Sequence, residues 1–314
     1  MLDFEKPIVE LEEKIDKLKQ SKLDAEKKRM QLLKLQTDLR SLKKNIYTNL
    51  SGWQKVQLSR HAERPYTLDY INSITSDFVE LHGDRKNGDD SAIVGGFASI
   101  DGEKVLIIGH QKGRSMKEKQ FRNFGMASPE GYRKALRLMK LAEKFNKPIV
   151  TFIDTPGASP GQDAETHGQA EAIATNLQEM LTLRVPVISI VIGEGAAGGA
   201  LGIALGDRML MLENTWLSVI SPEVCSSILW KNWDYKEKAA DQMKLTPKDL
   251  CNINLIDGVI HEPLGGAHKD VKSTCRNVKK AILKQLDELK NSSPEERITN
   301  RINKYSSIGM FEEA

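Results

Sequence analysis

The chain has 314 residues, of which 39% are hydrophobic, so it is long enough to bury at least one full core. Its 46 basic and 43 acidic side chains leave a formal net charge of only +3, which argues against a nucleic acid or an anionic membrane as partner. The three cysteines are widely spaced and no apolar run approaches about 18 residues, so we expect no disulfide framework and no membrane span. The charged N-terminus lacks a secretory apolar region, and we expect a cytoplasmic protein.

The first fifty residues carry leucine and isoleucine at steps of three and four. This spacing predicts two helices, which form a hairpin over 1–50 that turns near Ser21 to Asp24. The many lysines of the hairpin lie mostly off its apolar seam, so we interpret them as solvated helix faces. A helical lead-in is expected over 51–91, with a further helix over 68–81 that follows Pro65.

From residue 92 onward the chain changes to short, β-branched apolar runs bounded by glycine. Buried strands are predicted over 92–100, 104–110, 148–154, 185–193, 208–213 and 255–261. Helical patterns over 130–145 and 164–183 separate several of these strands, and another helix is expected over 268–289. We therefore predict an α/β domain over 92–291 with parallel strands and crossover helices, opened by a hairpin at Asp101-Gly102. The tail over 292–314 is polar and expected to be loose.

The most informative segment is the glycine-rich stretch over 191–205, where an apolar strand leads into small residues and then a helix. Backbone amides at a helix start have no internal acceptor, and the absence of side chains lets a negative oxygen approach them. Gly198 and Gly199 lie at this predicted start, and we expect them to form an oxyanion hole. The alternative is that these glycines serve only tight helix packing.

A second glycine-rich turn follows the strand over 148–154 and reads Gly157-Ala-Ser-Pro-Gly161. Ligand crevices in α/β folds form at such carboxyl ends of strands. The pattern matches the Gly-x-Ser-x-Gly motif of serine hydrolases, with Ser159 as nucleophile and His167 or His261 as base. However, the residue after the serine must donate its amide to the oxyanion hole, and Pro160 has none. We therefore do not expect a serine hydrolase.

A basic cluster follows the strand over 104–110 and includes Lys112, Arg114 and Arg122. Such a cluster suits phosphates, although a solvated loop would have the same composition and no Gly-x-x-x-x-Gly-Lys-Ser/Thr phosphate loop is present. The six histidines show no metal-ligand spacing, and we predict no metal site. No catalytic triad or carboxylate pair stands out.

Several motifs, in order from about residue 2 to residue 268, closely resemble the carboxyltransferase alpha subunits of bacterial acetyl-CoA carboxylase. They lie at 64–70, 93–96, 107–114, 123–126, 129–139, 152–157, 192–195, 219–223 and 262–268. The resemblance implies a crotonase-like α/β fold, with ββα units stacked as a superhelix, and an active site shared with a separate beta subunit in an alpha2beta2 assembly. It also implies that the chain is inactive alone.

The reaction implied by the resemblance moves a carboxyl group from carboxybiotin to acetyl-CoA and forms malonyl-CoA for fatty acid biosynthesis. Biotin is then carried on the biotin carboxyl carrier protein, and ATP is used only by a separate biotin carboxylase. By position, Gly198 and Gly199 would hold the ureido oxygen of biotin, and replacing Gly199 by valine should stop transfer while the tetramer stays folded. The remaining substrate-binding candidates are Gly157, Ala158, Gly195, Ala197, Lys112, Arg114 and Arg122.

Two positions depart from the family pattern. Ser159 stands where an aromatic residue is expected, and Ala196-Ala197 replaces a common Gly-Ser before the paired glycines. The second change keeps the amide donors. Two other functions are compatible with the residues: a free-standing hydratase or isomerase that uses Glu194 or Glu165 as acid and base, and a non-catalytic assembly protein that binds through the hairpin over 1–50.

Overall fold

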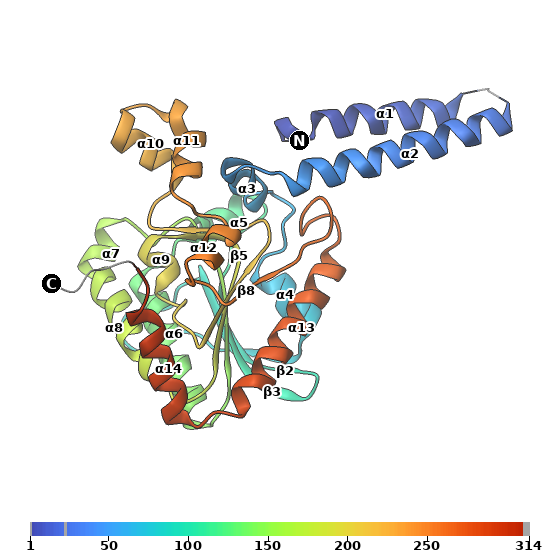
Figure 1. Ribbon diagram of the computed structural model, residues 1–314. Helices are drawn as coiled ribbons and strands as arrows, with labels where there is room; N and C mark the ends of the chain where they lie inside the picture. Colours follow the sequence, from blue (N-terminus) through green and yellow to red (C-terminus); the bar gives the residue numbers. More distant parts are fainter. Residues whose placement is uncertain (1, 22–23, 310–314) are drawn as a thin grey trace.

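A computed structural model describes residues 2–21 and 24–309. The centre of the molecule is a mixed sheet in which the described residues form eight strands in the order β1-β2-β3-β4-β5-β6-β8, with β7 paired to β5 (Figure 1). The strands are β1 (Ser76–Glu80), β2 (Ile93–Ile100), β3 (Glu103–His110), β4 (Ile149–Thr155), β5 (Val187–Ala196), β6 (Arg208–Leu212), β7 (Trp216–Ser218) and β8 (Gly258–Ile260).

The sheet is antiparallel at one side and parallel through the rest. Strands β1, β2 and β3 are antiparallel, whereas β3, β4, β5, β6 and β8 are parallel neighbours. The predicted hairpin is confirmed: β2 and β3 are joined at Asp101 and Gly102, whose φ angles of 48° and 89° suit the left-handed turn that matches strand twist. Parallel strands place their carboxyl ends at one edge, so the turns after β4 and β5 lie together there.

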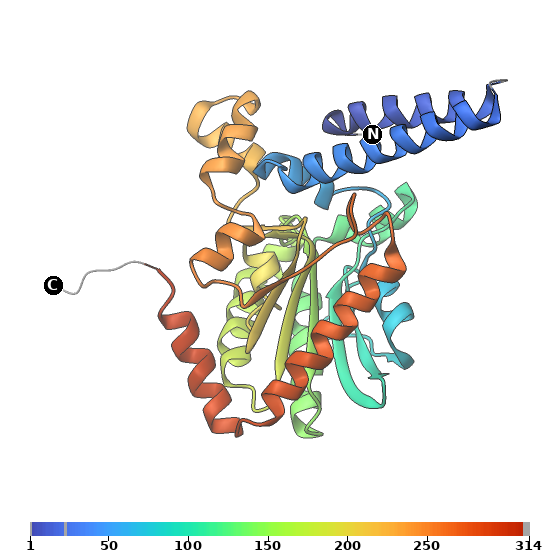
Figure 2. The ribbon, with the colours of Figure 1, turned by 45° about the vertical axis from the view of Figure 1, so that its right-hand side comes forward.

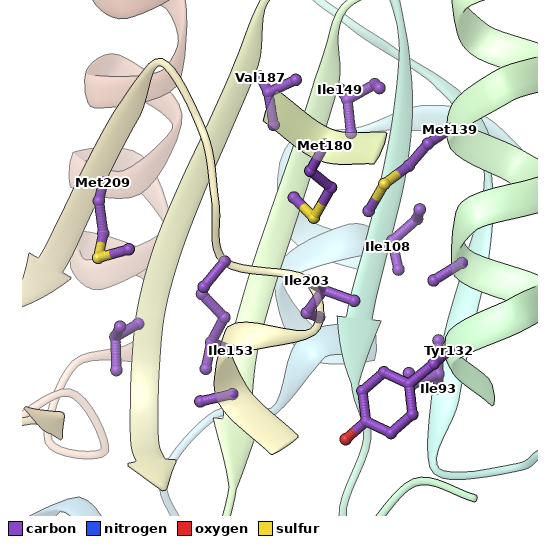
Figure 3. Close-up of a cluster of buried hydrophobic side chains, with 14 of the residues drawn as sticks. Ile93, Ile108, Tyr132, Met139, Ile149, Ile153, Met180, Val187, Ile203 and Met209 are labelled. Atoms are coloured by element: carbon purple, nitrogen blue, oxygen red, sulfur yellow. The ribbon is translucent and has the colours of Figure 1, made fainter. Parts of the chain in front are cut away.

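Helices cover both faces of the sheet (Figures 1 and 2). On one face α6 (Pro129–Lys144) and α8 (Gln169–Thr182) contribute to the larger hydrophobic core, part of which Figure 3 shows. On the other face α4 (Thr67–Ile74) and α13 (Val271–Lys290) contribute to a second core. Both sides of β4 and β5 are fully buried, which explains the continuous apolar runs of these strands.

The N-terminal hairpin, α1 (Lys6–Gln20) and α2 (Ala25–Thr48), projects from the body of the molecule (Figures 1 and 2). At its base Tyr47 donates a hydrogen bond of 2.7 Å to Glu5, and the Lys43 ammonium lies 2.6 Å from the Glu12 carboxylate. The predicted turn includes residues 22–23, which lie outside the described residues. The helix α3 (Gly52–Ser59) then leads into the body.

Apart from α14, which is described below, the remaining helices are short. They are η1 (Asp3–Glu5), α5 (Met116–Phe121), η2 (Asn123–Gly125), α7 (Gln162–Thr166), α9 (Ala197–Leu201), α10 (Pro222–Trp230), η3 (Trp233–Tyr235), α11 (Lys236–Gln242) and α12 (Pro247–Asn252). Helices α10 and α11 form a second projection above the sheet (Figure 1), for which we predicted no element from the sequence.

Three segments differ from the predictions. The helix expected over 164–183 is interrupted at Gly168, whose φ is 83°, and forms the separate helices α7 and α8. The helix expected over 68–81 ends at Ile74, and the chain continues as the edge strand β1, because residues 76–80 pair with β2. Gly96 permits this pairing, since a Cβ there would lie 2.1 Å from the carbonyl oxygen of Val79. The expected loose tail instead contains α14 (Pro294–Ser306). Arg301 of α14 is 1% exposed and holds the helix against the body through Asp207, 2.8 Å away.

Candidate active site

The turns after β4 and β5 touch each other at the carboxyl edge of the sheet. A Cβ at Gly199 would lie 2.4 Å from both the nitrogen of Ala158 and the carbonyl carbon of Gly157. Real Cβ atoms do not come this close to backbone, so Gly199 must be glycine for the two turns to pack. The structure therefore brings together Gly157, Ala158 and Gly199. It also supports the alternative that Gly199 is needed for tight packing.

Gly198 has a different environment. A Cβ there would meet only the Ile173 side chain, at 3.8 Å, so packing does not require this glycine. The turn is sharp: Ala197, the first residue of α9, has a φ of 55°. A left-handed conformation costs a residue with a Cβ about 1–2 kcal/mol. Such strain is typical of functional turns, and the first amides of a helix lack an acceptor within the helix.

A mainly apolar hollow of about 360 Å³ lies beside this turn. Ala197 and Gly198 form part of its wall. The other lining residues are Leu201, Leu205, Met209, Leu217, Ser218, Val219, Met243, Leu250, Leu255 and Tyr305. Its size and apolar character are those of a small-molecule site, and the turn supplies backbone polar groups at its edge.

A buried charge cluster ties the ends of β4 and β5 to the loop after β3. The Lys112 ammonium lies 2.7 Å from Asp154 and 2.7 Å from Glu194, and Glu194 also accepts a 2.6 Å hydrogen bond from Arg60. Burial alone would lower the pKa of Lys112, but the two carboxylates outweigh it and raise that pKa above its ordinary value. Burial would raise the pKa of Glu194, yet Lys112 and Arg60 hold it below its usual range. Both groups are therefore charged and paired.

This cluster bears on two expectations. Lys112 stays a candidate phosphate ligand, and its ammonium is paired with two buried carboxylates. No carboxylate pair stands out in the sequence, whereas Asp154 and Glu194 meet at Lys112 in the structure. The position of Asp154, at the carboxyl end of a predicted strand, was the available signal. A cavity of about 350 Å³ lies over the cluster, lined in part by Lys112, Glu194, Arg60 and Tyr66.

The other basic candidates have partners that are not part of the glycine turns. The Arg114 guanidinium lies 2.6 Å from Asp69 and stacks over the Tyr66 ring at 4.8 Å. Arg122 donates a 2.8 Å hydrogen bond to the carbonyl of Ser91. Gly195 lies within β5 opposite β7, where a Cβ would meet the Leu217 side chain at 2.8 Å. Five of the predicted site residues lie together where the two glycine turns meet: Gly157, Ala158, Ala197, Gly198 and Gly199.

The residues of the serine hydrolase motif do not form a triad. The Ser159 hydroxyl accepts a 3.3 Å hydrogen bond from Asn123. The imidazole of His167 instead lies 2.8 Å from Glu130, and the exposed His261 lies 3.5 Å from Glu213. This geometry agrees with the argument from Pro160 that the motif is not a nucleophile elbow.

Within residues 2–21 and 24–309, no group of three or more histidine, cysteine or acidic side chains is placed to hold a metal ion. Over the same residues, no helix is long and apolar enough to cross a membrane.

The fold is shared with known carboxyltransferases. The transcarboxylase 12S structure with methylmalonyl-coenzyme A and methylmalonic acid has a TM-score of 0.57 at 19% identity, over 78% of this chain and 42% of that one. A Pseudomonas malonate decarboxylase hetero-tetramer in complex with coenzyme A has a TM-score of 0.59 at 14% identity, over 76% of this chain and 94% of that one. The fold is that of the crotonase-like carboxyltransferases.

The sequence comparisons are more specific. The family model described as acetyl co-enzyme A carboxylase carboxyltransferase-like matches residues 1–309, and the chain belongs to this family. Acetyl-coenzyme A carboxylase carboxyl transferase subunit alpha of Chlorobaculum parvum is 55% identical over 100% of this chain and 98% of its own length. The protein of that name from Flavobacterium johnsoniae is 56% identical over 99% of both chains.

Proposed function

We propose that this chain is the alpha half of a carboxyltransferase that moves a carboxyl group from biotin to acetyl-CoA and forms malonyl-CoA. The observation that carries the proposal is the contact between the turns at Gly157 and Gly199, beside the hollow lined by Gly198. Relatives more than half identical over nearly the full length are named for this activity.

Gly198 and Gly199 act through their backbone amides. Biotin, bound in the adjacent hollow, would supply the carboxyl group to be transferred. The hollow fits such a group, because its wall is largely apolar and the turn supplies backbone donors at one edge. Amides fixed in a low-dielectric site stabilise a developing negative oxygen, and one such donor is worth on the order of 100- to 1000-fold in rate.

A partner chain completes the site in this proposal. A second negative charge develops on the thioester oxygen of acetyl-CoA, and a carboxyltransferase beta subunit would supply the amides that hold it, in an alpha2beta2 complex. Biotin would arrive on the biotin carboxyl carrier protein, after a biotin carboxylase has used ATP to load it. The chain alone is therefore expected to be inactive.

Neither carboxylate proposed for the hydratase or isomerase alternative is both buried and free of an ion pair. Both carboxylate oxygens of Glu194 are engaged, one by Arg60 and one by Lys112, and its pKa is held low. Glu165 lies on the exposed surface of α7. The assembly-only alternative predicts that all function resides in the hairpin, and carboxyl transfer retained after deletion of residues 1–50 would exclude it.

The test is reconstitution. The chain is purified alone and together with a candidate beta subunit, and malonyl-CoA formation is measured with carboxylated biotin as donor. Turnover by the mixture, but not by either chain alone, is expected. Hydration of an enoyl-CoA by the lone chain, or full carboxyl transfer without a partner, would refute the proposal.

A further inference from the structure

The side chain of Tyr132, on α6, contacts the turn that carries Gly198 and Gly199. The residue is fully buried, and its hydroxyl donates a 3.1 Å hydrogen bond to the carbonyl oxygen of Gly199. Figure 3 shows the ring of Tyr132 directed toward the short helix α9, beside Ile203. The hydroxyl is thus bound to the backbone of the proposed oxyanion hole from the side opposite to solvent.

Further contacts hold the same ring in place. A Cβ at Gly202 would lie 2.6 Å from the Tyr132 ring, so the end of α9 packs directly on that ring. The fully buried Asn176 of α8 donates from Nδ2 to the carbonyls of Tyr132, at 3.0 Å, and Gly202, at 2.9 Å. Helices α6, α8 and α9 are therefore joined at one point, and the position of the Tyr132 hydroxyl is well defined.

The surroundings of the Gly199 carbonyl contain a second buried polar side chain. His110 at the end of β3 is fully buried, and neither ring nitrogen has a hydrogen-bond partner in the part of the chain that the structure describes. Burial, reinforced by Lys112, lowers the pKa of His110 to about 3, while the nearby carbonyls of Gly199 and Phe152 act in the opposite direction. The imidazole is neutral, so it brings no competing charge beneath the turn.

We propose that Tyr132 is a positioning residue for the oxyanion hole, which rests on the function proposed above. In a helical turn the carbonyls point toward one end of the axis and the amides toward the other. Fixing the Gly199 carbonyl therefore also fixes the direction in which the amides of the turn point. Because stabilisation of an oxyanion depends on donors already in place, loosening this hydrogen bond lowers the rate of the chemical step without weakening substrate binding.

The test replaces Tyr132 by phenylalanine in the complex of this chain with its beta subunit. The ring and its contact with Gly202 remain, and only the hydroxyl is lost. The matched control is Tyr70→Phe, because Tyr70 is equally buried but its hydroxyl has no hydrogen-bond partner among the described residues. Loss of one buried hydrogen bond is expected to lower kcat of Tyr132→Phe by about three- to tenfold, with KM for acetyl-CoA unchanged. The control should retain wild-type kcat.

A second measurement does not depend on activity. Hydrogen exchange of the amides over 197–202 should be faster in Tyr132→Phe by about three- to tenfold and unchanged in Tyr70→Phe. Wild-type exchange in Tyr132→Phe, or a kcat equal to that of the control, would overturn the inference. If the wild-type complex transfers no carboxyl group, the proposed function fails by itself, and the exchange result still decides whether Tyr132 holds the turn.

Discussion

Replacing Gly199 by alanine separates the packing role of the turn from its chemical role when it is compared with the same change at Gly198. At position 199 the new Cβ would lie 2.4 Å from backbone atoms of both Gly157 and Ala158. Backbone cannot move aside as a flexible side chain can, so the turn that carries the amides must shift. At position 198 the new Cβ would make an ordinary 3.8 Å contact with Ile173.

The magnitudes follow from these distances. Overpacking of this kind destabilises a protein by about 1–3 kcal/mol, whereas the compatible change at Gly198 should leave stability unchanged or raise it by less than about 1 kcal/mol. A displaced oxyanion donor costs on the order of 100- to 1000-fold in kcat. We therefore expect Gly199→Ala to lose both stability and turnover, and Gly198→Ala to retain its stability and its amide donor.

The assay is malonyl-CoA formation by the reconstituted complex, with thermal melting of each variant measured in parallel. A Gly199→Ala complex with wild-type turnover and melting temperature would refute the reasoning. The larger change Gly199→Val, which the sequence suggested as a clean test, is not clean. Any Cβ at this position collides with the neighbouring turn, so loss of turnover in Gly199→Val could come from packing as well as from chemistry, even in a folded tetramer.

Three further changes test the structure around the site. Lys112→Met leaves the buried Asp154 without a cationic partner and Glu194 with Arg60 alone, so we expect a loss of about 3–5 kcal/mol in the free energy of unfolding. A higher KM for acetyl-CoA with unchanged stability would instead indicate a phosphate ligand. Arg301→Leu removes the buried partner of Asp207, and a similar loss by urea unfolding is expected, with wild-type stability contradicting the docking of α14. Burial, and after it the neighbouring His61, lowers the pKa of His268 from 6.5 to about 4. As the pH drops from 6.5 toward 4, His268 is therefore protonated in the unfolded chain before it is protonated in the folded one, so the free energy of unfolding should fall over this range. His268→Phe keeps a ring stacked on His61 and should lose less stability over that pH range; identical pH profiles of the urea midpoint would contradict this.

The sequence predicted the elements whose periodicity is set by burial. The runs that became β4 and β5 are apolar because both faces of these strands are covered, and the hairpin at Asp101-Gly102 followed from turn chemistry. Elements decided by tertiary contacts were missed. Strand β1 exists because Gly96 lets it pair with β2. Helix α14 is held by the buried Arg301, but the polar composition of the segment gives no sign that this arginine is buried.

In the candidate site, too, features with a local sequence pattern could be predicted, whereas features set by tertiary contacts could not. Gly198 and Gly199 could be identified because a strand that leads through small residues into a helix has a local signature. The role of Lys112 could not, since its carboxylate partners Asp154 and Glu194 lie 42 and 82 residues further along the chain. Tyr132 was likewise hidden inside an amphipathic helix, where nothing local distinguishes a core tyrosine from one bound to the turn.

The most direct test of the central claim is a structure of the complex of this chain with its beta subunit and biotin. We predict that the ureido oxygen of biotin lies within about 3.2 Å of the backbone nitrogens of Gly198 and Gly199, in the hollow beside α9. Biotin bound elsewhere, with these two amides facing solvent or protein, would contradict it.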